Sequence, residues 1–279
     1  MRSGLSCVRD DAIGRTVLTA LEVIDKGSAT EAHPFALLFV HGGYHAAWCW
    51  DEHFLDYFAG NGFRALAVSL RGHGRSTRSK PLGSISISDY VDDVRSAADR
   101  LDSEPVLVGH SMGGFVVQKY LQTYRAPATV LMASMPPQGV LRVIFGTMRR
   151  HPWIFLRANT FGNSAELMNT PDRAREFLFS AHTPTSVVEL CAARLEPESR
   201  RAGLDQMFRL PKPRLSTSPL LVLGAQDDGT LTNAEVTATA RTYGAHAEFF
   251  SGMGHNMMLE PGWQAVAERI DGWLTDRGL

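Results

Sequence analysis

The stretch that most constrains the fold of this chain is residues 109–114, with the sequence GHSMGG. It joins a short apolar run, EPVLVGHS, to MGGFVVQKYLQTY, in which apolar residues recur at helical spacing. In a sharp turn between a strand and a helix, side chains at the glycine positions would collide with the adjacent backbone. The pattern therefore predicts a buried strand, a tight turn that exposes the side chain of Ser111, and a helix that begins at Met112.

Short apolar runs and helical patterns alternate along most of the chain. We expect strands at residues 15–24, 34–43, 62–70, 104–111, 128–134, 219–228 and 245–250. We expect helices at residues 47–59, 86–101, 112–124, 232–243 and 262–276. Thr232 and Glu235 are spaced for a capping box at the start of the fourth helix. This alternation predicts a mostly parallel sheet with helices on both faces.

The alternation stops between residues 137 and 218. That segment is helical in pattern, rich in Phe, Met and Arg, and broken by the turn signals HPW, TPD, TPT and EPES. We therefore expect a core of residues 1–136 and 219–279 and a helical cap of residues 137–218. Large apolar side chains of the cap either line a pocket or, for most of them, form a core of their own. These side chains are Phe145, Met148, Trp153, Phe155, Phe161, Phe177 and Phe179.

Composition and charge argue against several classes of protein. The 28 Lys and Arg residues nearly balance the 29 Asp and Glu residues and are scattered, which argues against nucleic-acid binding. No run resembles a signal peptide or has the length to span a bilayer, so the expected location is the cytoplasm. Cys7, Cys49 and Cys191 lie far apart without metal-ligand spacing, so neither a disulfide framework nor a metal site is expected. The length of 279 residues favours one elaborated domain and leaves the oligomeric state open.

Ser111 is the candidate nucleophile. The G-x-S-x-G spacing places it on a strained turn, and the helix that follows directs N–H groups at the place where negative charge develops in acyl transfer. The alternative is a glycine-rich turn with an incidental serine. The position of the motif between a buried strand and an amphipathic helix favours the nucleophile.

A candidate base and acid follow Ser111 in the chain. His255 lies in the glycine-rich stretch FFSGMGH, between the last strand and the last helix. The acid is expected at the end of the strand PLLVLG, where a carboxylate holds the imidazole in one tautomer; Asp227 and Asp228 both qualify. The other histidines at strand ends and loops are expected to serve packing or polar support, with His110 pointing away from Ser111. They are His41, His45, His73 and His110.

Two backbone N–H groups are candidates to bind an oxyanion. The N–H of Met112 stands at the start of the helix after Ser111. The strand PFALLFV ends in HGGY, and this loop is expected to supply a second donor from Gly43. The alternative for Gly43 is a plain turn glycine.

With these pieces in chain order, the sequence resembles the α/β-hydrolase superfamily from about residue 35 to the C-terminus. The matching stretches are LFVHGGYHAAWCW, LRGHGRS, GHSMGG, LGAQDD and GMGH. HGGYHAAWCW is similar to small plant-type esterases and hydroxynitrile lyases, and GMGHNMMLEPGW to bacterial lysophospholipase-like hydrolases. The resemblance implies an α/β-hydrolase fold with a helical cap inserted after the fourth βα unit. It also implies a cofactor-free enzyme with a Ser-His-Asp triad and an oxyanion hole from Gly43 and Met112.

The resemblance favours Asp228 over Asp227 and argues against some family activities. In the superfamily the acid is followed by two variable residues, an aliphatic one and then Pro or Thr, and residues 229–232 follow Asp228 in that order. Hydroxynitrile lyases of the similar group carry a lysine directly after the catalytic histidine, where this chain has Asn256. Epoxide hydrolases and haloalkane dehalogenases need an Asp at the position of Ser111.

The combined pattern predicts a serine hydrolase that cleaves a carboxylic ester of a small to medium apolar substrate through an acyl-enzyme. Carbon–carbon bond, lactone or thioester hydrolysis, acyl transfer and lysophospholipase activity remain alternatives, because they share the triad and the cap decides the substrate. A different class is a non-catalytic small-molecule receptor on the same scaffold. No sequence feature supports a protein interaction module.

Overall fold

The computed structural model describes residues 20–153, 156, 164–208, 210 and 218–279. The described strands form a seven-stranded sheet in the order β1-β3-β2-β4-β5-β6-β7. Their bounds are β1 Val23–Lys26, β2 Leu37–Val40, β3 Ala65–Val68, β4 Val106–His110, β5 Thr129–Met132, β6 Leu220–Ala225 and β7 Ala247–Phe250. Only β1 pairs antiparallel, with β3, so this sheet is mostly parallel, as predicted.

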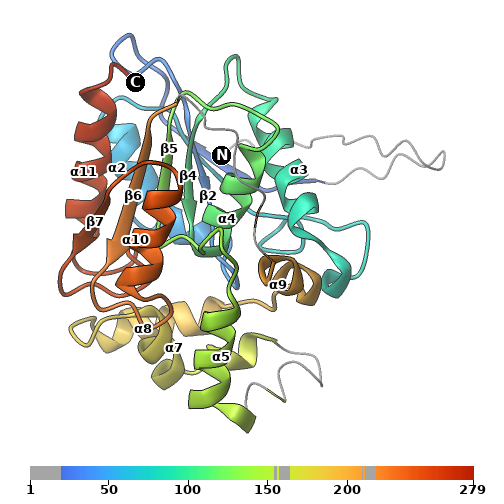
Figure 1. Cartoon of the computed structure of the whole chain (residues 1–279). Helices are drawn as coiled ribbons and strands as arrows, with labels where there is room; N and C mark the ends of the chain where they lie inside the picture. The colour runs from blue at the N-terminus through green and yellow to red at the C-terminus, as the bar shows by residue number, and fades with distance from the viewer. Residues whose placement is uncertain (1–19, 154–155, 157–163, 209, 211–217) are drawn as a thin grey trace.

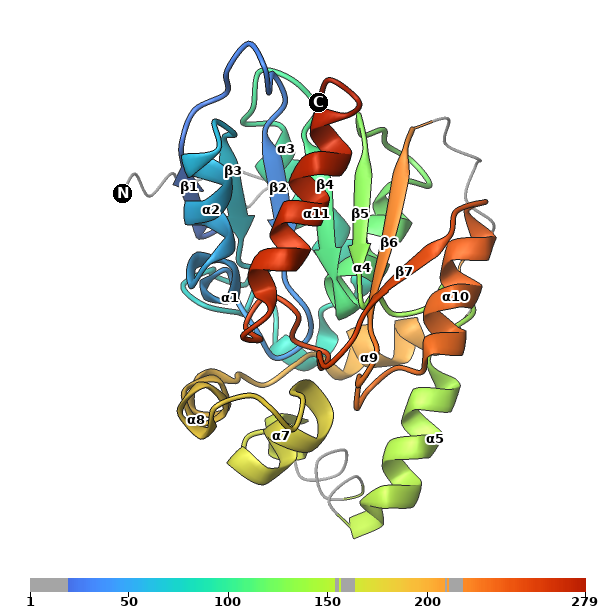
Figure 2. The same cartoon turned by 90° about the vertical axis from the view of Figure 1, so that its left-hand side faces the viewer.

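Helices cover both faces of the sheet (Figures 1 and 2). On one face lie α1 (Trp48–Asp51), α2 (Phe54–Gly60) and α11 (Trp263–Thr275); on the other lie α3 (Ile87–Ala98), α4 (Ser111–Tyr120) and α10 (Asn233–Thr242). Successive side chains of a strand point to opposite faces, so Phe39 of β2 belongs to the first core cluster and Leu38 to the second. The buried strand β2 therefore connects the two cores.

Two sequence expectations about element bounds need correction. The helix expected at residues 47–59 is broken at His53, whose φ of −147° leaves the helical region and whose ring stacks on Trp263 at 4.7 Å between centroids. The strand expected at residues 15–24 begins only at Val23, where pairing with β3 begins, and residues 15–19 lie outside the described part. The capping box of Thr232 and Glu235 at α10 is confirmed.

The described helices of the 137–218 segment lie beyond the carboxyl ends of the strands (Figure 2). They are α5 (Leu141–Arg150), η2 (Ser164–Leu167), α7 (Pro171–Leu178), α8 (Thr185–Arg194) and α9 (Arg200–Gln206). Outside this segment, a further short helix, η1 (Leu82–Ser84), precedes α3. The apolar side chains of the segment divide into two groups. Phe177 and Phe179 are buried in the first core cluster. Phe145, Met148 and Trp153 are exposed by 61%, 39% and 79%. These three side chains therefore do not form a separate core within the segment. Phe155 and Phe161 lie outside the described residues.

A buried ion pair ties this segment to the rest of the fold. The Glu198 side chain is only 8% exposed; its Oε2 lies 3.3 Å from Nε2 of His73, and Tyr90 donates its hydroxyl to Oε1 at 2.6 Å. Burial by itself would raise the pKa of Glu198, but His73 and Tyr90 lower it below the ordinary value. Burial would likewise lower the pKa of His73, but the Glu198 charge raises it. Each of the two groups therefore favours the charged form of the other.

We expect Glu198→Gln to destabilise the fold most between about pH 4.5 and 6.5, the ordinary pKa values of the two groups. The lowered pKa of Glu198 gives its full stabilisation above about pH 4.5. The raised pKa of His73 gives its full stabilisation below about pH 6.5, and this stabilisation is lost as pH rises through the raised pKa. Urea denaturation at pH 6 should show a loss of about 3 kcal/mol in the free energy of unfolding. The loss should be smaller at pH 9.

A matched control is Glu196→Gln, two residues earlier. Glu196 accepts from the N–H of Gly74 at 2.9 Å, and its charge contributes less than that of Glu198 to the raised pKa of His73. Its replacement should cost less stability than Glu198→Gln and show a weaker pH dependence. An equal loss at both pH values for Glu198→Gln would contradict the ion pair.

Candidate active site

Ser111 stands at the junction of β4 and α4. Its φ is +51°, a left-handed conformation that residues with a side chain rarely adopt. A Cβ added to Gly109 would lie 2.7 Å from the Cα of Gly114, so the end of the strand and the start of the helix pack without room for a side chain. The turn has the tight geometry that the GHSMGG pattern predicts, but Ser111 is buried and not exposed as expected.

The side chain of His255 lies between those of Ser111 and Asp228. Its Nε2 is 2.9 Å from Oγ of Ser111, and its Nδ1 is 2.7 Å from Oδ2 of Asp228. Ser111 is 5% exposed, and the side chains of His255 and Asp228 are 3% and 1% exposed. Because an ionised carboxylate only accepts, Nδ1 carries the ring proton, which leaves Nε2 of the neutral ring to accept from the serine hydroxyl. Chemically, this arrangement can draw a proton from Ser111.

Asp228, and not Asp227, meets the histidine. The second oxygen of Asp228, Oδ1, accepts from the N–H groups of Thr230 at 2.7 Å and Leu231 at 2.8 Å, which fixes the orientation of the carboxylate. Asp227 is exposed, and its backbone N–H donates to the carbonyl of Met253 at 3.0 Å. The structure therefore brings together the three side chains that the sequence pattern and the family register single out.

The candidate oxyanion donors lie beside the serine. A Cβ added to Gly42 would be 2.9 Å from Cβ of Ser111, and one added to Gly43 would be 3.9 Å from Sδ of Met112. The loop after β2 and the first turn of α4 are thus in direct contact. Gly43 and Met112, the two residues expected to donate, both lie at this contact.

The peptide that carries the Gly43 N–H is held by His41. Nδ1 of this buried ring lies 2.8 Å from the carbonyl oxygen of Gly42, and Leu70 donates its N–H to Nε2 at 3.0 Å. The ring is therefore neutral with its proton on Nδ1, and burial lowers the pKa of His41 to about 3. Because C=O and N–H of a trans peptide point in opposite directions, the bond to Gly42 turns the Gly43 N–H the other way.

Two further buried groups hold the loop that carries His255, and the sequence did not indicate either contact. His110 lies with Nε2 2.9 Å from the carbonyl oxygen of His255, a polar support of the kind expected for it. Glu260 is 1% exposed and accepts from the N–H groups of Gly254 at 2.8 Å and Ser180 at 2.5 Å. Glu260 was visible only as part of the GMGHNMMLEPGW stretch, and no local pattern shows that its carboxylate turns back to this loop.

No metal centre is found in the described part of the chain, where no group of three or more His, Cys, Asp or Glu side chains is placed to hold an ion. Within the same residues, no helix is both long and apolar enough to cross a membrane. Cys49 and Cys191 are buried free thiols, and Cys7 lies outside the described residues.

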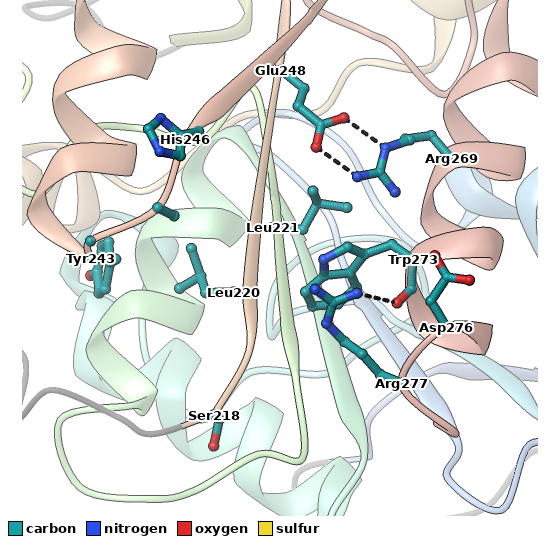
Figure 3. A pocket seen from close by; sticks show the side chains of 12 residues that line it. Ser218, Leu220, Leu221, Tyr243, His246, Glu248, Arg269, Trp273, Asp276 and Arg277 are labelled. Carbon is teal, nitrogen blue, oxygen red and sulfur yellow. Dashed lines mark hydrogen bonds and ion pairs between the residues drawn. The ribbon is translucent and has the colours of Figure 1, made fainter.

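A separate pocket of about 450 Å³ opens at the amino ends of β6 and β7 (Figure 3). Arg269 and Glu248 form an ion pair of 2.7 Å within it, and Trp273 of α11 lines it. Asp228 follows the carboxyl end of β6, at the opposite edge of the sheet. This pocket therefore does not belong to the site around Ser111.

Comparison with known proteins agrees with the geometry. The sequence model of the alpha/beta hydrolase family matches residues 37–269. A non-heme chloroperoxidase of Streptomyces lividans is 34% identical over 105 residues, which are 36% of this chain and 37% of that protein. A pFDCC methylesterase of Arabidopsis thaliana is 26% identical over 210 residues, which are 68% of this chain and 76% of that protein. The chain spans 37% or less of the length of the first relatives that it matches.

Solved structures are similar over nearly the whole chain. A thermophilic esterase from Thermogutta terrifontis, solved with malate bound, superposes with a TM-score of 0.75. The superposition covers 98% of this chain and 100% of that one at 22% sequence identity. At this level of identity the likeness concerns the fold.

Proposed function

Because this chain belongs to the alpha/beta hydrolase family, we propose that it is a serine hydrolase that cleaves carboxylic esters. The observation that carries the proposal is the chain of contacts from Oγ of Ser111 through His255 to Asp228, at 2.9 and 2.7 Å. A methylesterase among the relatives supports this reaction class. Ser111 is then the nucleophile, His255 the general base and Asp228 the acid that orients it.

In the proposed reaction, Nε2 of His255 takes the hydroxyl proton as Oγ of Ser111 attacks the ester carbonyl. The tetrahedral oxyanion accepts hydrogen bonds from the N–H groups of Gly43 and Met112, which are in place before the reaction begins. As the carbon–oxygen bond of the ester breaks, His255 gives its proton to the leaving alcohol. Water, deprotonated by His255, then attacks the acyl-enzyme and releases the acid and the free serine. No cofactor takes part in this scheme.

The proposed substrate is a small molecule with a small to medium apolar acyl group. The described helices of the 137–218 segment lie at the carboxyl ends of the strands (Figure 2). Ser111 directly follows the carboxyl end of β4, and we take the segment as a cap that bounds the substrate. Phe177 and Phe179 bring apolar surface to this side of the core. Glu198 approaches the oxyanion loop, with Oε2 3.6 Å from where a Cβ of Gly43 would lie. Oε2 of Glu198, and not the ring of His73 that pairs with it, is the nearest atom to this position, so the carboxylate disfavours an anionic group there by charge repulsion.

We expect a fluorophosphonate probe to label the protein covalently at Ser111, because the hydrogen bond to His255 activates this hydroxyl. Intact-mass and peptide mass spectrometry would locate the adduct. Ser111→Ala should abolish it, while Ser134→Ala, a change of another buried serine that lies close to α4, should leave it in place. Labelling that persists in Ser111→Ala would refute the assignment of the nucleophile.

The two neighbouring aspartates offer an internal control for the acid. We expect Asp228→Asn to lower kcat for a nitrophenyl ester by up to about four orders of magnitude, because an amide in this place permits the wrong imidazole tautomer. Asp227→Asn should leave kcat nearly intact, because Asp227 is exposed. The reverse ranking in steady-state kinetics would move the acid to Asp227.

Esters of one acyl length but different charge test the proposed pocket. We expect an apolar acyl ester to be hydrolysed faster than one that ends in a carboxylate, in kcat/KM, because an anion would meet the Glu198 carboxylate and apolar surface. The rate difference should shrink in Glu198→Gln. Equal rates for both esters in the unaltered protein would contradict an apolar pocket.

A further inference from the structure

A buried histidine, His45, connects the loop of the proposed base with the loop of the proposed oxyanion hole. Its Nδ1 lies 2.8 Å from the carbonyl oxygen of Gly43, and its Nε2 lies 3.1 Å from Nδ2 of Asn256. Asn256 directly follows His255 and is fully buried, and His45 is 1% exposed. The contact joins residues 211 positions apart in the sequence.

The atoms allow only one direction of hydrogen bonding along this connection. The Gly43 carbonyl can only accept, so Nδ1 of His45 must carry a proton. Burial lowers the pKa of His45 to about 4, so the ring is neutral near pH 7 and Nε2 must accept. The amide of Asn256 must therefore present its NH₂ group, as it does. The donors run from Asn256 to His45 to the Gly43 carbonyl.

The orientation of the Asn256 amide is consistent with this constraint. Its Oδ1 is buried without a hydrogen-bond partner among the described residues, which is an unfavourable state for a polar atom. Turning the amide over would set Oδ1 against the acceptor Nε2 and remove the donor that His45 needs. The hydrogen bond to His45 therefore sets the orientation of the amide, although this orientation leaves Oδ1 without a partner.

The bond from His45 acts on the backbone on one side of Gly43, and His41 acts on the other. His41 holds the carbonyl of Gly42, before the Gly43 N–H, and His45 holds the carbonyl of Gly43 itself. A glycine has unusually free backbone dihedrals, and these two contacts restrict both of them at Gly43. The direction of the Gly43 N–H then depends on both rings.

We infer that Asn256 and His45 form a positioning relay, which sets the direction of the Gly43 N–H in the oxyanion hole from the residue next to the general base. The inference rests on the proposed function, since it assigns a task to the oxyanion loop of that reaction. Neither residue touches the reacting atoms. Both act through the Gly43 peptide, and the relay couples the proton-transfer half of the site to its oxyanion half.

Two substitutions of His45 separate its donor from its acceptor. Asn places an amide NH₂ near the position of Nδ1 and keeps the bond to Gly43, whereas Gln reaches toward Nε2 and loses it. We expect His45→Gln to lower kcat for a nitrophenyl ester about tenfold to a hundredfold with KM nearly unchanged, which is less than complete loss of an oxyanion donor. His45→Asn should lose less, because it keeps the bond to Gly43 and breaks only the contact with Asn256. Equal loss in both variants, with thermal unfolding unchanged, would overturn the relay.

A variant at the other end of the relay covers the case in which His45→Gln fails to fold. Asn256→Leu keeps the same number of side-chain heavy atoms and removes the donor to His45, so it should lower kcat by a factor closer to that of His45→Asn than to that of His45→Gln. The double variant with His45→Gln should lose little more than His45→Gln alone, because one chain of contacts is broken twice. Fully additive losses would contradict the relay.

Cys191→Ala is the control for packing. Its Sγ contacts both Nε2 of His45, at 3.8 Å, and Nδ2 of Asn256, at 3.5 Å, yet it supplies neither bond of the relay. We expect kcat to stay close to that of the unaltered protein. A loss as large as that of His45→Gln would show that packing, and not the relay, sets the rate.

Inhibition by a transition-state analogue distinguishes the relay from a merely structural role, which would leave the inhibition constant unchanged. A trifluoromethyl ketone forms an adduct with Ser111 that carries an oxyanion, so its inhibition constant should rise in His45→Gln in proportion to the loss of kcat/KM. An unchanged constant would overturn the relay. Failure of the unaltered protein to hydrolyse esters or to take up a fluorophosphonate would instead refute the proposed function. The two failures are therefore distinguishable.

Discussion

The close approach of β4 and α4 at the Ser111 turn is the constraint on which the rest of the site depends. A side chain at Gly113 would collide with the carbonyl oxygens of Val40 and His41 at the end of β2. The helix therefore packs directly against the neighbouring strand end, and the loop after β2 comes to lie beside Ser111. The left-handed backbone of Ser111 is tolerated because the packing around it leaves no alternative path for the chain.

Around this turn, neutral histidines organise the backbone. Burial keeps the pKa of His41, His45 and His110 below the ordinary value, so each ring offers one donor and one acceptor in a fixed arrangement. Each ring nitrogen that meets a carbonyl oxygen holds one peptide, of Gly42, Gly43 or His255. A charged ring would present two donors and cost more to bury. Neutral rings thus supply directional contacts without adding charge next to the proposed triad.

Much of the fold was predictable because it depends on local patterns. The alternation of apolar runs and helical stripes indicated the parallel sheet, and the spacing of Thr232 and Glu235 indicated the cap of α10. The residues at which helices begin and end were less predictable where contacts between residues far apart in the sequence decide them. Residues 47–59 read as one helix, but the stacking of His53 on Trp263 accompanies a break that no local pattern marks. The apolar residues of α5 read as core, yet Phe145 is exposed, because helical spacing does not reveal what covers a helix.

The sequence by itself determined the Ser111 turn and the histidine loop, because glycine spacing and chain order are local properties. It left the acid between Asp227 and Asp228 until family register favoured one, since adjacent residues share the same local pattern. Only the tertiary structure brought Asp228 to His255, Glu198 to His73, and Asn256 to His45. These contacts join side chains far apart in the sequence. Their meeting depends on the order and direction of the strands, which bring distant strand ends to one edge of the sheet.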